Sequence, residues 1–304
     1  MGMDRNLLAF LAIARCGNLT AAAERLRLAQ PSLTKRLKLL EDEYRTPLFD
    51  RQPRGMTLTR AGQELLAHAT GIEQAYLQAR ETIEATKSER LDVLRIGAGP
   101  LFRRAYLAGA FEVLRDEYPE TRLVLQADVH LRNLPLLRQG ELDAVFGALV
   151  VDVADTAIEV RHMAVVHLGA LARSDHPILA HGQITASALA RMQWILYSND
   201  PETTAMVRGY FIRNGLRPPE FAVQTTSYEF GLNLLSTGQY VMPAPIELDS
   251  SFAPLGLTAL PLADPIDRFP AGAYVRKSSL NYPIVRRMLE LVDAQTSRLD
   301  RLEP

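Results

Sequence analysis

The first 44 residues place apolar side chains at helical spacing, interrupted by two short breaks. The small side chains of residues 21–23 would let a second helix cross closely, and the break at 27–29 leads into Gln30-Pro31. Proline is favoured in the first turn of a helix, because its φ is already helical and its missing N–H would have no partner there. This order predicts a helix-turn-helix. Two stripes carry the pattern: Leu7, Phe10, Leu11 and Ala14, and then Leu33, Leu37, Leu40 and Tyr44.

The second of these helices also has a polar face, turned away from its apolar stripe. Hydroxyls and amines of this kind bond phosphates or base edges in a major groove. A solvated helix face with ordinary lysines would show the same residues, so the face alone leaves that alternative open. Combined with the helix-turn-helix it predicts DNA binding. The outward residues are Pro31, Ser32, Thr34, Lys35 and Lys38.

A longer helical pattern follows, and Thr59 can cap its start. Its apolar positions step by four and three residues, which is the spacing of a coiled-coil seam. Packing of this helix on its own domain is the alternative, but the segments on either side have cores of their own, so we favour pairing with a second chain. Residues 84–92 are polar and predict a hinge. The seam comprises Leu65, Ala69, Ile72, Tyr76, Ala79 and Ile83.

From Val93 onward, short apolar strands alternate with amphipathic helices, which predicts an α/β domain with a mostly parallel sheet. A long apolar stretch at 161–172 crosses to a second α/β unit. Residues 272–276 and a helix at 283–296 then return to the first. The expected layout is therefore two lobes joined by two crossings, with lobe I at about 93–162 and 268–304 and lobe II at about 163–267.

Charge is unevenly distributed along the chain. Residues 1–62 carry 11 lysines and arginines against 6 acids, a net of +5, whereas the remainder carries 23 against 29, a net of −6. A basic head on an acidic body fits a DNA-binding module attached to a part that does not bind DNA. Cys16 is the only cysteine, so no intrachain disulfide can form, which favours a reducing, cytoplasmic location. Neither a signal peptide nor a membrane helix is expected.

Enzymatic and metal chemistry find little support in the sequence. Gly97-Ala-Gly99 lacks the third glycine and the acid of a dinucleotide site. The six histidines show no metal-binding spacing. Ser174, Asp175 and His176 are consecutive, which does not suit a triad assembled in space. We therefore expect no enzyme activity, no cofactor and no metal site.

A series of positions in the head carries a family signature: Phe10, Ala14, Gly17, Leu19-Thr20, Ala22-Ala23, Leu26, Gln30-Pro31, Leu37, Leu40-Glu41, Leu48-Phe49, Arg51, Leu58-Thr59 and Ala61-Gly62. Through these positions the head resembles that of the LysR-type transcriptional regulators. Three departures stand out: Asn18 and Thr34 replace usual serines, and Arg45 replaces a usual glycine, where a left-handed conformation would be costly. The body resembles the family more loosely, through residues 94–97, Pro119, 140–143, 176–177 and 238–243.

This resemblance implies three parts. An all-α winged helix-turn-helix DNA-binding domain at 1–62 is followed by a linker helix and hinge at 63–92 that pairs two subunits. A two-lobed, periplasmic-binding-protein-like effector domain then occupies 93–304. The implied partners are double-stranded operator DNA with two-fold symmetry, a small-molecule inducer, and a second copy in a homodimer, with a homotetramer through the bodies. The residues expected at the DNA are Asn18, Thr20, Gln30, Pro31, Ser32, Thr34, Lys35, Lys38, Thr59 and, in the wing, Arg51 and Arg54.

Ligands of two-lobed domains sit between the lobes, at strand ends and helix N-termini. Family members that bind carboxylates often place Ser or Thr just after the first and second strands of this domain. This chain has Leu101 and His130 at those two positions. The expected cavity is therefore more apolar, with His130 as an acceptor or titrating group; a surface-loop histidine is the alternative. The expected effector-binding residues are Leu101, Phe102, His130, Phe146, Ser198, Asn199, Pro201 and Thr226.

The sequence thus predicts a LysR-type regulator whose operator binding or promoter activity is modulated by a small molecule. The rival class is a solute-binding or enzymatic α/β protein with an incidental helical head. A second rival is a DNA-binding head on a body that only supports oligomerisation.

Overall fold

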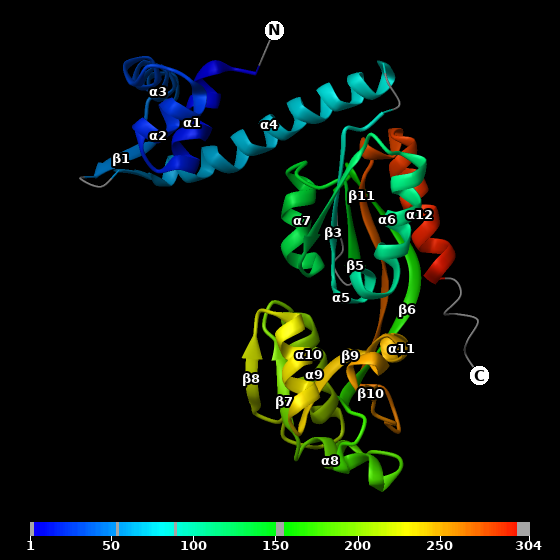
Figure 1. The fold of residues 1–304 in the computed structure, drawn as a ribbon. Coiled ribbons are helices and arrows are strands. Elements are labelled where there is room, and N and C mark those ends of the chain that lie inside the picture. The colour runs from blue at the N-terminus through cyan, green and yellow to red at the C-terminus, as the bar shows by residue number, and fades with distance from the viewer. Residues whose placement is uncertain (1–2, 53–54, 88–89, 150–154, 297–304) are drawn as a thin grey trace. The chain divides into compact units, whose positions relative to one another are not determined.

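The computed structural model describes residues 3–52, 55–87, 90–149 and 155–296. The chain forms two compact units, residues 1–84 and 85–304, which we describe separately (Figure 1).

The first unit holds the predicted helix-turn-helix. Asp4 and Asn18 cap the first two helices with side-chain oxygens that accept backbone N–H groups. The helices are α1 (Arg5–Cys16), α2 (Leu19–Leu26) and α3 (Gln30–Tyr44), so α3 begins at the predicted residue. Strands β1 (Phe49–Gln52) and β2 (Gly55–Leu58) pair antiparallel. This wing hairpin adds two strands to a head that the sequence described as all-α.

The head core follows the two predicted stripes, with one exception. Leu33, Leu37 and Leu40 are at most 3% exposed, but Tyr44 is 49% exposed. The prediction that Tyr44 packs on the first helix is therefore wrong. Tyr44 is the last residue of α3, and the chain turns at Arg45, which adopts the left-handed conformation with φ 53°.

Two residues of the family motif hold the start of the wing in place. The Glu41 carboxylate accepts the backbone N–H of Leu48 at 2.8 Å. A Cβ at Gly62 would lie 2.1 Å from the Leu48 carbonyl oxygen, so only glycine allows helix α4 to begin this close to the wing. These contacts explain why the motif contains Leu40-Glu41, Leu48-Phe49 and Ala61-Gly62: Glu41 and Gly62 both contact the backbone of Leu48.

Helix α4 (Arg60–Lys87) is the predicted long helix, and Thr59 caps it as expected. It runs past the predicted hinge start at 84, because residues 84–87 include good helix formers. The predicted seam divides in two. Ala69 is fully buried in the head core and Leu65 packs against that core, whereas Ile72 and Ile83 are 53% and 56% exposed.

The second unit is two-lobed, as Figure 1 shows, with the long strands β6 (Ile158–Arg173) and β11 (Asp267–Arg276) running from one lobe to the other. The sheet order is β4-β3-β5-β11-β6-β9-β7-β8, with β10 beside β6. Strand pairs within each lobe are parallel, and the crossing strands pair antiparallel. The predicted two crossings are confirmed.

Lobe I contains three further strands and the helices that cover them. The first helical segment of lobe I begins at Pro100 and includes a π-helical turn at Arg103–Leu107. Such turns often occur near functional sites. The remaining elements are β3 (Val93–Ala98), α5 (Pro100–Phe102), α6 (Ala108–Glu117), β4 (Arg122–Ala127), α7 (His130–Arg138), β5 (Ala144–Ala148) and α12 (Pro283–Thr296).

Lobe II has the same alternation of strands and helices. Its core surrounds Trp194, Phe211 and Leu260. The elements are α8 (Ala186–Leu189), β7 (Gln193–Tyr197), α9 (Pro201–Arg213), β8 (Phe221–Thr225), α10 (Tyr228–Thr237), β9 (Tyr240–Pro245), α11 (Asp249–Phe252) and β10 (Leu257–Ala259).

A buried ion pair fixes the end of β11 in lobe I. The Arg276 guanidinium donates to Asp143 at 2.8 Å, and both side chains are at most 5% exposed. Asp143 also accepts the backbone N–H of Arg95 at 2.8 Å and the Ser279 hydroxyl at 2.9 Å. This network explains why the body's Gly140–Asp143 motif ends in an acid: the carboxylate ties together three segments of lobe I.

Candidate DNA-binding face and ligand pocket

The outer face of α3 carries most of the predicted DNA-binding residues. Its first turn is exposed, opposite the buried Leu33 and Leu37. Thr34 differs: it is half-buried, and its hydroxyl donates to the Gln30 carbonyl at 3.1 Å, so that group already has a partner in the helix. The exposed residues are Gln30, Pro31, Ser32, Lys35 and Lys38.

Two of the other predicted DNA-binding residues cap helices. Asn18 Oδ1 accepts the N–H of Ala21 at 2.8 Å, which fixes the start of α2. Thr59 accepts the N–H of Gly62 at 3.0 Å and donates to the Pro47 carbonyl at 2.9 Å. Thr20 is exposed at the start of α2. The side chain of Arg51, and Arg54 entirely, lie outside the described residues.

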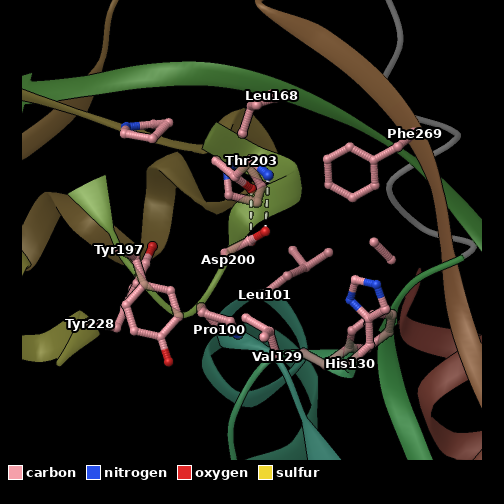
Figure 2. A pocket seen from close by; sticks show the side chains of 16 residues that line it. Pro100, Leu101, Val129, His130, Leu168, Tyr197, Asp200, Thr203, Tyr228 and Phe269 are labelled. Atoms are coloured by element: carbon pink, nitrogen blue, oxygen red, sulfur yellow. Dashed lines mark hydrogen bonds between the residues drawn. The ribbon is translucent and has the colours of Figure 1, made fainter. Parts of the chain in front are cut away.

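The second unit contains a pocket between its lobes. Lobe I contributes Leu101 at the start of α5 and His130 at the start of α7. Lobe II contributes Asp200, which precedes α9, and Tyr228, which is the first residue of α10. Its volume is about 80 Å³, enough for several water-sized groups and therefore for a small molecule. Figure 2 shows Tyr197 and Tyr228 at one end and His130 with Phe269 at the other.

Most of the wall is apolar, and a few polar groups break it. Asp200 caps α9, accepting the Thr203 N–H at 2.9 Å and the Thr203 hydroxyl at 2.8 Å. Tyr197 and Tyr228 meet edge to face with ring centroids 5.8 Å apart. Burial raises the pKa of both phenols, so each stays a neutral hydroxyl. Apolar walls with a few oriented polar groups are typical of small-molecule sites.

His130 is a buried pocket residue and not a surface-loop histidine, since it is 4% exposed. Its Nε2 lies 2.9 Å from Oε2 of Glu202 in the other lobe. Burial lowers the pKa of His130, an effect that Asp200 partly offsets. Burial, helped by the nearby Asp200 charge, raises the pKa of Glu202 to about 7. Burial therefore shifts both groups toward their neutral forms.

The predicted effector-binding residues fall into three groups. Leu101, Phe102 and His130 line the pocket. Phe146 is fully buried 5.5 Å from the Phe102 ring and supports the wall from behind. The other four do not line the pocket, which corrects the placement expected for Ser198, Asn199, Pro201 and Thr226.

Neighbours of those four residues form the lobe II wall. Tyr197 is the last residue of β7, Asp200 caps α9, and Tyr228 is the first residue of α10. Cap patterns mark two of these positions in the sequence: Asp200-Pro201 before α9, and Ser227 before Tyr228. Asn199 instead donates to Asp128 of lobe I at 3.4 Å, a second contact between the lobes. The crossing strands add Leu168 and Phe269, which no motif indicated.

Comparison with protein families agrees with this architecture. Residues 5–63 match the bacterial regulatory helix-turn-helix protein, lysR family, and residues 87–297 match the LysR substrate binding domain. The chain therefore belongs to the LysR family of bacterial transcriptional regulators. It combines a helix-turn-helix DNA-binding domain with an effector-binding domain, and this membership confirms the expected regulator class over the enzymatic rival.

Similar proteins share most of the length of the chain. The transcriptional regulator TdcA of Escherichia coli K12 is 24% identical over 301 residues, 95% of this chain and 91% of its own. The Hca operon transcriptional activator HcaR of the same strain is 28% identical over 242 residues, 77% of this chain and 78% of its own.

Solved structures share the fold. A full-length OxyR variant from Pseudomonas aeruginosa has a TM-score of 0.65 at 22% identity, covering 97% of this chain and 95% of its own. Full-length CbnR in complex with its target DNA has a TM-score of 0.64 at 21% identity, covering 96% and 100%. Among the described residues, no helix has the length and apolar character to cross a membrane, and no group of three potential metal ligands occurs.

Proposed function

We propose that this chain binds an operator of two-fold symmetry through the exposed face of α3, as a cytoplasmic homodimer that assembles further into a tetramer. We propose also that a small molecule in the pocket between the lobes modulates this binding or the promoter activity that follows from it. The pocket carries the second proposal, because residues of both lobes converge on it.

The DNA-binding half rests on the two faces of α3. Leucines fix one face in the head core, so the opposite residues Gln30 and Lys35 are presented on a rigid helix. Glutamine can pair bidentately with adenine, and lysine can bond guanine or phosphate. A gel shift with the chain's own upstream DNA tests this half. We expect a specific complex with wild-type protein and a much weaker one with Lys35→Ala.

The control is Lys277→Ala, which removes an exposed lysine from the other unit and should leave the complex unchanged. Equal binding of upstream and scrambled DNA by the wild-type protein would contradict the DNA-binding half.

The effector half rests on population shift. A ligand changes the regulator only if it binds one lobe arrangement better than another, and a pocket walled by both lobes meets this condition. Ala148 lines the pocket at the end of β5. Ala148→Phe should fill the space and fix the output of a reporter fused to the upstream DNA, while operator binding persists. A reporter that still responds to growth conditions as in wild type would favour a body that serves only as an oligomerisation scaffold.

A further inference from the structure

The pocket has an unusual charge balance. Sixteen of the described residues line it, and they include one carboxylate, Asp200, and no lysine or arginine. The oxygens of Asp200 accept two hydrogen bonds, both from Thr203. A carboxylate offers about four acceptor positions, so Asp200 retains capacity for a ligand. A second acid, Glu202, follows Asp200 in the first turn of α9, and the Asp200 charge contributes to the raised pKa of Glu202.

The pocket also contains a buried hydroxyl, that of Tyr228, without a hydrogen-bond partner among the described residues. Tyr228 is 7% exposed and lines the cavity. A buried hydroxyl without a partner is destabilising. A bound molecule with a polar group at this end of the pocket would satisfy it. This observation is independent of the acids and also indicates a ligand.

The aromatic walls favour a positive charge. Tyr197 and Tyr228 form an edge-to-face pair beside Asp200, and Phe269 lines the opposite end (Figure 2). Ring faces attract cations, most strongly where water is excluded. An anionic ligand would instead meet Asp200 with no lining cation beside it. Arg103 and Arg104 are competing cations: the charge of Arg103 acts on both tyrosines and that of Arg104 acts on Tyr228, but neither arginine lines the pocket.

We propose that the pocket takes a small organic amine, whose protonated nitrogen binds Asp200 and whose apolar body lies against Leu101, Leu168 and Phe269. This inference rests on the proposed function, because it names the ligand class of the same pocket. A compact cation with an aromatic or aliphatic body uses each observed feature: the carboxylate, the ring faces and the apolar walls.

Three compounds of similar size test the ligand class. Benzylamine is a cation, benzyl alcohol is neutral and benzoate is an anion. In calorimetric titrations of the full-length protein at neutral pH, benzylamine should bind about tenfold more tightly than benzyl alcohol, and benzoate should bind most weakly.

Asp200→Asn isolates the carboxylate, because asparagine keeps the capping oxygen that accepts the Thr203 N–H. It should weaken benzylamine about tenfold and leave benzyl alcohol nearly unchanged. Asp293→Asn, an exposed acid on α12, is the matched control and should change neither.

Three results would overturn the amine assignment: tighter binding of benzoate than of benzylamine, no benzylamine binding at millimolar concentration, or benzylamine binding that Asp200→Asn does not weaken. Operator binding by the same samples distinguishes failure of the amine assignment from failure of the proposed function. Intact operator binding without amine preference contradicts only the ligand class, whereas loss of specific operator binding contradicts the proposed function.

Discussion

His130 and Glu202 join the two lobes beside the pocket, with Nε2 of the histidine 2.9 Å from Oε2 of the glutamate. His130 begins α7 in lobe I, and Glu202 lies in the first turn of α9 in lobe II. Both groups are displaced by burial toward their neutral forms. The contact therefore links the arrangement of the lobes to the protonation state of a carboxyl that titrates near physiological pH.

Glu202→Gln should reveal this titration as a pH-dependent change in stability. The Glu202 pKa rises from 4.5 to about 7 on folding, so the folded state binds the proton more tightly. The stabilisation that comes from protonated Glu202 is fully present below pH 4.5 and is lost as pH rises through about 7. Glutamine resembles the protonated form at every pH. From pH 5 to pH 8, the free energy of unfolding of the variant relative to that of wild type should therefore rise by about 1 kcal/mol. This rise is smaller than the full linkage value because solvent screens the partly exposed carboxyl.

Urea unfolding midpoints at the two pH values measure this difference. A variant whose stability relative to wild type is the same at pH 5 and pH 8 would show that Glu202 does not titrate in this range.

Arg276→Ala should strongly destabilise the effector domain. It leaves Asp143 buried at 3% exposure without its guanidinium partner, and removing one partner of a buried pair costs about 3–5 kcal/mol. Arg287→Ala is the matched comparison, since it breaks a partly exposed ion pair with Glu117 and should change the denaturant midpoint little. Equal midpoints for the two variants would contradict the structural weight placed on the Asp143 network.

Arg45→Gly should stabilise the head. Arg45 follows α3 in the left-handed conformation with φ 53°, which is strained for a residue with a Cβ and easy for glycine. We expect a gain of about 1 kcal/mol in the free energy of unfolding. Arg45→Ala removes the same side chain but keeps the Cβ, so it should give no comparable gain. If both variants have the same thermal midpoint, the gain does not come from the backbone.

Ile72→Asp should split the proposed dimer. Ile72 is 53% exposed on α4, and it continues the seam past the segment that packs into the head. A charge in an apolar interface without a partner is costly, so light scattering should show half the wild-type mass. Ile212→Asp alters an isoleucine on α9 that is 63% exposed and should leave the mass unchanged. A wild-type mass for Ile72→Asp would remove this residue from the subunit interface.

The helices of the head, and α12 in the effector domain, could be predicted closely because their signals are local. The start of α3 follows from Gln30-Pro31, and α12 coincides with the predicted 283–296. The fate of the seam was not predictable, since periodicity shows which side of α4 is apolar but not what covers it. Ala69 and Ile72 share that side, yet one is buried in the head core and the other is exposed.

The pocket shows the same limit at finer scale. Strand ends could be located from the sequence, and three residues chosen at these ends, Leu101, Phe102 and His130, line the pocket. Which of several consecutive loop residues faces the cavity depends on the local turn. The chain turns after Tyr197, so Ser198 and Asn199 point elsewhere while Asp200 returns to the wall. Leu168 and Phe269 reach the pocket only because the crossing strands pass beside it.

Gln30→Ala should relax base preference at one position of each half-site, because one bidentate contact contributes about 1–3 kcal/mol of discrimination. Selection from random DNA with the full-length variant measures this. Lys277→Ala should return the wild-type motif, since that lysine lies in the effector domain. An unchanged motif with Gln30→Ala would show that this residue does not read a base.

The most direct test of the account is the affinity of the full-length protein for its own upstream DNA relative to a scrambled duplex, measured by fluorescence anisotropy at fixed salt. A LysR-family regulator that reads DNA through α3 should prefer the upstream duplex by about a thousandfold or more, and Lys35→Ala should weaken binding to both duplexes. Equal affinity for the two duplexes, or identical binding by wild type and Lys35→Ala, would contradict recognition through this face.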